Sequence, residues 1–455
     1  VLDNSHTAFP PTAETIYAAL LCIGGTRAPR FSSLLTLGML LLAAGSLAMR
    51  CGLTGRQSWW VAALIATMPA IYFGSVNCFV DGIYAAFVLA AMRIGFDAEK
   101  TGHWAIFGIF CGLAMGTKYT GLLALPVLIL TAAIIGISRK NLAWRLVVRD
   151  AFLAAAIACV VAAPYYARNW ILLGCPIYPP PPGYEIFCSP KYLSAETIKQ
   201  FHAYIAQRGA GLGRNFLAFV LLPYNLTYHT SNFHGAGGIG LCPLALGPLG
   251  MFVSRKDKFV KGIAIAAFLV VVAWFLTQQE SRFLIHVYVI AAILSVIGWR
   301  DVLSTRNPSS RIIAGGIVAT SLLYGMFMMD GNLSASVRAV VSPAFAQQER
   351  STNIPYYQSF RYLNTTEDVK KVLILDRSVP PFYCDKEYLK PIGQWGEVTI
   401  TGISTAVQAI DQVHALNITH ILDVSSQAAP FQVAVNDPRL LRVFEDTNQR
   451  IYRVK

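Results

Sequence analysis

The sequence predicts a bundle of membrane-spanning α-helices followed by a small α/β domain at the C-terminal end. Of its 455 residues, 55% are hydrophobic and only 13% are charged, whereas an ordinary soluble chain carries about 25% charged residues. Apolar stretches also recur along the first three quarters of the chain, and most are near the ~20 residues that cross a hydrocarbon core as a helix. The fold class is therefore mainly α, polytopic and transmembrane.

Ten apolar stretches are predicted to cross the membrane. The shortest covers residues 104–116, and an apolar helix over residues 13–25 is too short to join the set. Because spans alternate between the two faces, the helix over 13–25 falls on the outer face, and we expect a first span ahead of the sequence as it stands. The predicted spans are residues 31–50, 58–74, 78–95, 104–116, 119–137, 148–170, 236–253, 260–277, 282–298 and 312–329.

The distribution of basic residues orients these spans. The formal net charge is +13, and Lys and Arg gather in alternate loops, which are cytoplasmic by the positive-inside rule. The charge excess thus indicates topology, and no nucleic-acid partner is expected. The basic side holds Arg50, Arg56, Arg139, Lys140, Arg145, Arg149, Arg255, Lys256, Lys258, Arg300, Arg306 and Arg311. The outer face then receives the loop 171–235 and the tail after Asp330, as expected in a bacterial inner membrane.

The chain divides into three parts by composition. Residues 1–12 are polar and form the remnant of a first outer loop, and residues 13–330 form the transmembrane domain. Residues 331–455 have the composition of a soluble α/β domain, which the topology puts outside the cytoplasm. The expected elements of this domain are strands at 372–375, 418–424 and 451–454, and a helix over 403–416.

The nine cysteines do not indicate a metal site, because no C-x-x-C or Cys/His spacing is present. Cys175 and Cys188 share the outer loop, where an oxidising compartment would permit a disulfide. Whether these two residues are joined is left open. No cofactor is indicated by the sequence, and the need for a divalent cation is left open as well.

Four polar clusters lie at the outer ends of the predicted spans. Asp81, at the start of a span, suits the dipole of a helix N-terminus, and Lys118 could extend its ammonium group to the interface. Arg168 and Asn169 end a span before the long outer loop, and residues 278–282 form a polar turn. Taken alone, each cluster has an ordinary structural explanation. Because all four fall on one face, the sequence predicts that they share a site.

The charges at these positions suit a lipid phosphate. Lys118 supplies a point charge, and Arg168 and Arg282 supply planar forks for phosphate oxygens. The Asp81 carboxylate could act as a base, orient an acceptor or help to hold a divalent cation. The proline-rich residues 176–182 would form a stiff edge to such a cavity.

The same segments resemble motifs of the GT-C superfamily of membrane glycosyltransferases, relatives of the protein O-mannosyltransferases and of the lipid A aminoarabinose transferase. Residues 112–121, Gly-Leu-Ala-Met-Gly-Thr-Lys-Tyr-Thr-Gly, resemble the family stretch GLAxxTKyxG. Residues 168–179 resemble RN…tGNPvyP, and residues 278–284 resemble Q…RYLlP. Residues 10–14 resemble PPxxE, and residues 416–422 resemble the outer C-terminal domain of several members. The motifs keep the family's order over essentially the whole chain.

The motifs also depart from the family pattern. Cys175 stands where the family has Asn, Phe283 stands where it has Tyr, and Ile285 and His286 replace its Pro segment. The family's expected base is a carboxylate in the first outer loop, upstream of PPxxE. The resemblance implies that this sequence begins too late to contain it, and Asp3 lacks the context for that role.

The resemblance implies transfer of a sugar from a polyprenyl-phosphate-linked donor to a glycan, lipid or protein acceptor at the outer face of the membrane. Asp81 matches the family's second acidic position and is the candidate catalytic residue. Lys118, Arg168 and Arg282 would hold the donor phosphate and stabilise it as a leaving group. The further substrate-binding candidates are Tyr119, Asn169 and Gln279.

Two other classes of function fit parts of the sequence. A transporter or flippase of a polar lipid also needs cations that face a membrane cavity, although transporters are often built from repeats with polar residues at mid-membrane. Here no repeat is evident, and the polar residues lie at span ends. A non-catalytic assembly protein would use the tail as a binding module, and that hypothesis predicts that the four clusters lie far apart.

Overall fold

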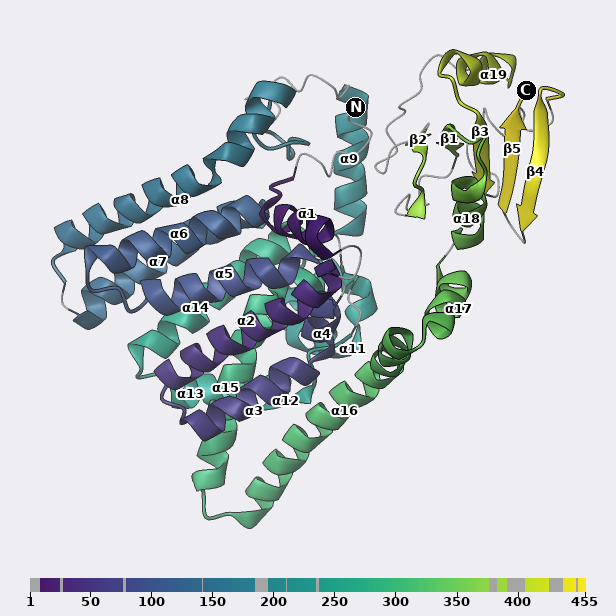
Figure 1. Cartoon of the computed structure of the whole chain (residues 1–455). Coiled ribbons are helices and arrows are strands. Elements are labelled where there is room, and N and C mark those ends of the chain that lie inside the picture. Colours follow the sequence, from purple (N-terminus) through teal and green to yellow (C-terminus); the bar gives the residue numbers. More distant parts are fainter. Residues whose placement is uncertain are drawn as a thin grey trace. The chain divides into compact units, whose positions relative to one another are not determined.

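The structure is a computed structural model of the 455-residue chain, and its helices and strands are labelled in Figure 1. It describes residues 9–24, 28–76, 79–140, 142–184, 195–209, 211–234, 237–354, 356–375, 383–390, 406–424, 437–446 and 449–455. Two compact units are distinguished. The helical unit comprises Ala8–Ser189 and Ile205–Gly331, and the C-terminal unit is formed mainly by Asn332–Lys455.

Every stretch predicted to be a span is a helix or a pair of consecutive helices. Two of the predicted spans are broken, and the first break follows from proline. Met68 is extended, and Pro69 begins the next helix, because proline disfavours the helical conformation in the residue before it. The helices are α1 (Thr12–Gly24), α2 (Ala28–Arg50), α3 (Gly55–Thr67), α4 (Pro69–Val76), α5 (Val80–Gly95), α6 (Thr101–Thr117), α7 (Thr120–Lys140), α8 (Trp144–Leu173), α12 (Leu241–Ala245), α13 (Gly247–Val253), α14 (Lys258–Leu276), α15 (Ile285–Ser304) and α16 (Pro308–Val341).

Five helical segments within the described part of the chain are long and apolar enough to cross a membrane. They are Thr120–Ser138, Trp144–Leu173, Lys258–Leu276, Ser281–Ser304 and Pro308–Asp330. The predicted span 31–50 lies in the 23-residue helix α2. The other predicted spans form helices of at most 17 residues or interrupted helices, so length alone does not mark them. The chain is an integral membrane protein, as the composition predicts.

Small residues bring α6 and α8 together, and α6, α7 and α8 lie side by side (Figure 1). A Cβ atom on Gly108 would lie 2.5 Å from the carbonyl oxygen of Ala154, and one on Gly112 would lie 2.8 Å from that of Ala158. Only glycine permits such close backbone contact between membrane helices. This packing holds the outer end of α6, where the Gly116–Gly121 segment begins.

The predicted outer loop 171–235 contains helices of its own. They are α9 (Ala195–Arg208), α10 (Phe216–Val220), α11 (Leu222–Tyr228) and the 3-10 helix η4 (Thr230–Phe233). A second 3-10 helix, η5 (Ser281–Leu284), joins the turn after α14 to α15. The elements η5, α5 and the α6–α7 turn carry the residues of the candidate site.

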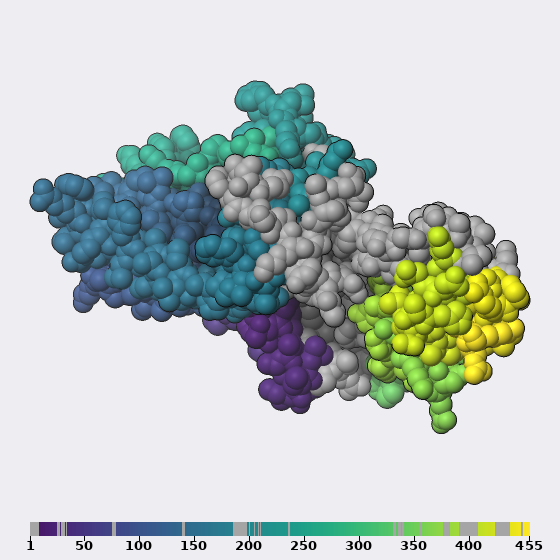
Figure 2. Space-filling view, turned by 90° about the horizontal axis from the view of Figure 1, so that it is seen from above, coloured from purple at the N-terminus to yellow at the C-terminus, as the bar shows by residue number. Residues whose placement is uncertain are grey.

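The C-terminal unit contains a five-stranded mixed sheet in the order β2-β1-β3-β5-β4. The strands β1 (Lys371–Ile374), β2 (Glu387–Leu389) and β3 (His420–Val424) are parallel, whereas β5 (Gln449–Val454) is antiparallel to both β3 and β4 (Leu440–Asp446). The strands predicted at 372–375, 418–424 and 451–454 are present as β1, β3 and β5. The edge strand β4 and its neighbour β5 form the yellow surface of this unit in Figure 2.

Helices cover both faces of this sheet. On one face, Ala409, Ile410 and Val413 of α19 (Ala406–Ala415) pack on Leu373 and Ile421. On the other face, Phe360 and Leu363 of α18 (Tyr357–Thr365) join Val372, Ile374, Leu422 and Ile451. Helix α17 (Pro343–Asn353) precedes α18. Successive apolar residues of β1 and β3 therefore point to opposite faces of the sheet, and both faces are covered.

Candidate functional site

Asp81 lies in the first turn of α5 and is a buried acid, with a 3% exposed side chain. Its Oδ1 atom forms an ion pair with Nζ of Lys118. Its Oδ2 atom lies 3.8 Å from Nε of Arg282. The structure thus brings together three residues from three separate segments, as the sidedness of the sequence predicts.

Lys118 lies in the tight turn between α6 and α7. The turn requires glycine, because a Cβ atom on Gly121 would lie 2.7 Å from the backbone nitrogen of Met115. The Nζ atom of Lys118 lies 3.1 Å from the centroid of the Phe283 ring, a cation–π contact. Burial lowers the pKa of Lys118 below its usual value, and the charge of Asp81 opposes that shift. The ammonium group is therefore held in the protein and does not simply extend to the interface.

Helix α1 packs against the same turn. The hydroxyl group of Thr12 donates a hydrogen bond of 2.6 Å to the carbonyl oxygen of Gly116. Tyr17 donates to the carbonyl oxygen of Phe79 at 3.4 Å, just before α5. The short apolar helix predicted at 13–25 therefore connects the two segments that carry Lys118 and Asp81.

Arg282 lies between two carboxylates. Its Nη2 atom is 2.8 Å from Oε2 of Glu280, in addition to the contact with Asp81. Glu280 is 3% exposed, and its carboxylate accepts a hydrogen bond of 2.8 Å from Nε2 of Gln278. Its backbone carbonyl oxygen accepts another of 2.8 Å from Nε1 of Trp274. About a third of the Arg282 side chain stays exposed, 33%. We name Asp81, Lys118, Glu280 and Arg282 the outer cluster.

Glu280 had no role in the sequence-based prediction. Glu280 lies in the polar turn 278–282, between the two predicted site residues Gln279 and Arg282. The sequence analysis included it in that turn but assigned it no function. A carboxylate two residues before an arginine in a turn would have been the signal. The outer cluster consequently holds two acids and two cations, whereas the sequence predicted one acid (Asp81) with three cations (Lys118, Arg168 and Arg282).

Tyr119 joins the Lys118 turn to the proline-rich part of the outer loop. Its hydroxyl group accepts a hydrogen bond from the backbone N–H of Tyr178 at 3.1 Å and donates to the carbonyl oxygen of Tyr178 at 3.2 Å. Nδ2 of Asn169 lies 3.3 Å from the same hydroxyl group and 3.4 Å from the carbonyl oxygen of Pro176. Tyr119 and Asn169 thus bind the protein's own loop.

The remaining two predicted residues lie nearby. Arg168 precedes Asn169 near the end of α8 and is partly buried. Gln279 is 1% exposed, and its Nε2 atom donates hydrogen bonds of 3.0 Å to the carbonyl oxygens of Gly213 and Phe275. These contacts attach the 278–282 turn to the outer loop. Gln279 therefore supports the position of Arg282 through the backbone.

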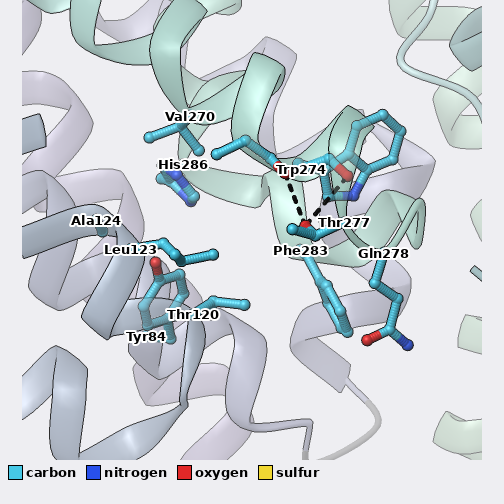
Figure 3. Close-up of a pocket in the computed structure, with 11 residues that line it drawn as sticks. Tyr84, Thr120, Leu123, Ala124, Val270, Trp274, Thr277, Gln278, Phe283 and His286 are labelled. Carbon is cyan, nitrogen blue, oxygen red and sulfur yellow. Dashed lines mark hydrogen bonds between the residues drawn. The ribbon is translucent and has the colours of Figure 1, made fainter. Parts of the chain in front are cut away.

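Figure 3 shows a pocket whose lining includes Gln278 and Phe283, which are close in sequence to Glu280 and Arg282 of the outer cluster. Phe283, whose ring makes the cation–π contact with Lys118, lines this pocket. His286 of α15 is 1% exposed and packs edge to face on Tyr84, with ring centroids 5.6 Å apart. The other lining residues are Thr120, Leu123, Ala124, Val270, Ala273, Trp274, Thr277 and Gln278. His286 was noted in the sequence only as a departure from the family motif.

Cysteine and metal chemistry add little to the site. Cys175 is disulfide-bonded, and Cys188, with which a disulfide was left open, lies outside the described residues. So does Asp3. Within the described residues, no group of three or more His, Cys, Asp or Glu side chains is arranged to hold a metal ion.

The comparisons with known proteins agree with the resemblance seen in the sequence. No protein-family model matches the chain. Over 175 residues the chain is 29% identical to the lipid A galacturonosyltransferase RgtD of Rhizobium johnstonii, a match that covers 36% of this chain and 34% of that protein. The aligned part therefore spans about a third of the length of this curated relative.

The whole fold resembles a solved membrane protein. ArnT from Cupriavidus metallidurans, bound to undecaprenyl phosphate, matches with a TM-score of 0.60 and 10% identity over 98% of this chain and 87% of its own. The apo state of the same protein matches with a TM-score of 0.56 and 15% identity over the same shares. At such low identity, the similarity concerns the fold.

Proposed function

We propose that this chain, which has the fold of the GT-C membrane glycosyltransferases, transfers a sugar from a polyprenyl-phosphate-linked donor to a glycan, lipid or protein acceptor. The reaction would take place at the outer face of a bacterial inner membrane. The observation that carries this proposal is the outer cluster, in which buried Asp81 is paired with Lys118 and lies beside Arg282. Undecaprenyl phosphate bound to ArnT and the lipid A glycosylation named for RgtD support the substrate class.

The cations of the outer cluster suit the charge that the reaction develops. An acceptor hydroxyl would attack the anomeric carbon, its proton would pass to a base, and the bond to the phosphate oxygen would break. The polyprenyl phosphate that leaves carries one more negative charge than the donor. Lys118 and Arg282 are two positive groups beside Phe283, in surroundings where opposite charges interact more strongly than in water.

Asp81 has one of two roles in this proposal. It could take the acceptor proton, or it could hold Lys118 and Arg282 in place for the phosphate. Both oxygens of Asp81 face these cations, which supports the positioning role. Glu280 holds the other side of Arg282 and supports its orientation in the same way. Arg168, Tyr119 and Asn169 keep their proposed place at the edge of the donor site, with Tyr119 and Asn169 holding the outer loop.

The test is sugar transfer by the full-length protein in proteoliposomes supplied with undecaprenyl-phosphate-linked sugars and lipid A acceptors. Arg282→Ala and Asp81→Asn should each lower transfer by about 10²-fold or more, the usual effect of removing one group that stabilises the transition state. Arg255→Ala is the matched control, because Arg255 is exposed and contacts only Phe252 in the described contacts. Unchanged transfer in both variants would refute the proposal. Movement of the lipid across the bilayer without any product would favour a transporter.

A further inference from the structure

His286 is a buried polar side chain that the charged site does not use. It is 1% exposed, and neither of its ring nitrogens has a hydrogen-bond partner among the described residues. Buried polar groups in native proteins are nearly always paired, and an unpaired one lowers stability. An imidazole in this state therefore indicates a partner that binds from outside the chain.

The surroundings of His286 form a pocket with apolar walls and few polar atoms. Figure 3 shows the imidazole beside Val270 and above Tyr84 and Leu123, with Phe283 and Gln278 on the opposite side. Aromatic and aliphatic walls with a small number of polar groups are typical of sites for small organic ligands. The unpaired imidazole faces this pocket, so a ligand there would meet its nitrogens.

Helix geometry relates this pocket to the outer cluster. Asp81 and Tyr84 are three residues apart on α5 and therefore share a face of that helix. Arg282 lies in the 3-10 helix η5, which leads directly into the first turn of α15, where His286 lies. One level contains the charges of Asp81 and Arg282, and the next contains the neutral rings of Tyr84 and His286. A phosphate held at the first level would direct its attached group toward the second.

We propose that this pocket receives the sugar of the donor and that His286 hydrogen-bonds one of its hydroxyl groups, with Tyr84 beside it. The proposal rests on the function proposed above and identifies His286 as the residue that recognises the sugar. A neutral imidazole has one donor and one acceptor nitrogen, which match a hydroxyl group that can do both. Phe283 and Trp274 would contact the apolar faces of the sugar ring. A prenyl chain offers no polar atom to His286, so the unpaired nitrogens favour the sugar.

The experiment compares two probes on the full-length protein in nanodiscs, with binding followed by the fluorescence of tryptophans including Trp274. One probe is undecaprenyl phosphate alone, and the other is undecaprenyl phosphate that bears a hexuronic acid, a hexose or a pentose. His286→Phe should weaken binding of the best sugar-bearing probe about tenfold, the effect of one lost hydrogen bond at a buried site, and leave the bare lipid unchanged. His286→Asn, which keeps a donor and an acceptor, should recover part of the affinity.

Ser295→Ala is the matched control, since Ser295 is buried on the same helix and donates only to the carbonyl oxygen of Ala291. The inference is overturned by equal losses for both probes, which would assign the pocket to the prenyl chain, or by no loss at all. Failure of the proposed function looks different: undecaprenyl phosphate would then not bind the wild-type protein, or Arg282→Ala would leave its binding intact. Thermal unfolding of each variant in the same nanodiscs establishes that it is folded.

Discussion

The helical unit has a second ionic cluster at its predicted cytoplasmic end, and the comparison with the outer cluster is instructive. Arg50 binds Asp97 through two hydrogen bonds, and Arg93 lies 3.0 Å from the same carboxylate. Arg50 also lies over the Phe259 ring, 4.6 Å from its centroid. We name Arg50, Arg93 and Asp97 the inner cluster. Both clusters thus combine two cations with an aromatic ring, and the inner cluster has one acid where the outer cluster has two.

The two clusters differ in the burial of their acids and in what lies beside them. Asp97 is 21% exposed, whereas Asp81 is 3% exposed. In the inner cluster one carboxylate joins the ends of two helices, as expected for a structural link. In the outer cluster Arg282 lies between two acids, and the ring that holds Lys118 is a wall of a pocket. Burial and an adjacent pocket, more than the kinds of residue, therefore separate a candidate site from a structural ion pair.

The largest difference is expected when one cation is removed from each cluster. Lys118→Met should lower sugar transfer by about 10²-fold, because a positive group beside the developing phosphate charge is lost. Arg93→Met should leave the turnover number within about twofold of wild type, since surface substitutions away from a site have small effects. Steady-state transfer in proteoliposomes at saturating donor measures both. Similar losses in the two variants would show that the clusters do not differ in function.

The inner cluster should contribute mainly to stability. Asp97→Asn leaves Arg50 and Arg93 without their carboxylate, and we expect it to lower the free energy of unfolding by about 1–2 kcal/mol, below the value for a fully buried pair because these side chains are partly exposed. Thermal unfolding in detergent gives the change, and transfer at a permissive temperature should stay close to wild type. A variant of normal stability that cannot transfer sugar would contradict this assignment.

A smaller effect is expected from the residues that support each cluster. Tyr119→Phe removes the hydroxyl group that links the Lys118 turn to Tyr178 and Asn169, and transfer should fall about fivefold, which corresponds to roughly 1 kcal/mol. Ser46→Ala is the counterpart at the other end, because the Ser46 hydroxyl accepts a hydrogen bond of 3.1 Å from Nε of Arg93. Transfer by that variant should be unchanged. A fall in donor affinity with an unaltered turnover number would instead make Tyr119 a substrate contact.

The spans were predictable because long apolar runs have few alternatives to a membrane helix. Breaks inside them were not predicted, although Pro69 supplied the signal for one. The strands β1, β3 and β5 carry apolar runs and were found, whereas β4 has no fully buried residue and β2 has only three residues. Neither β2 nor β4 has the pattern of a buried strand.

The candidate site was predictable to the level of sidedness. Positions along the spans bring Asp81, Lys118 and Arg282 to one end of the membrane, but they do not say which side chains touch. His286 was missed for this reason, since its ring contact is with Tyr84 of another helix. Glu280 was missed although its partner Arg282 is only two residues away in the same turn. The assignment of Gln279 to substrate binding stays a prediction, and its side-chain nitrogen donates a hydrogen bond to Gly213 of the outer loop. Local sequence predicts at which end of a membrane helix a residue lies better than it predicts which side chains that residue contacts.

The smallest expected effect is the response of the two clusters to salt. Charges near water are screened over about 10 Å at 0.1 M ionic strength and about 3 Å at 1 M, while buried pairs are screened much less. The stability lost in Asp97→Asn should therefore shrink by about 0.5 kcal/mol between these salt concentrations, because that cluster is partly exposed. The ratio of turnover numbers between wild type and Lys118→Met should not move, because Asp81 and Lys118 are largely shielded from solvent. If salt changed that ratio and left the Asp97→Asn penalty constant, water would reach the outer cluster more readily than the inner one, and burial would no longer distinguish them.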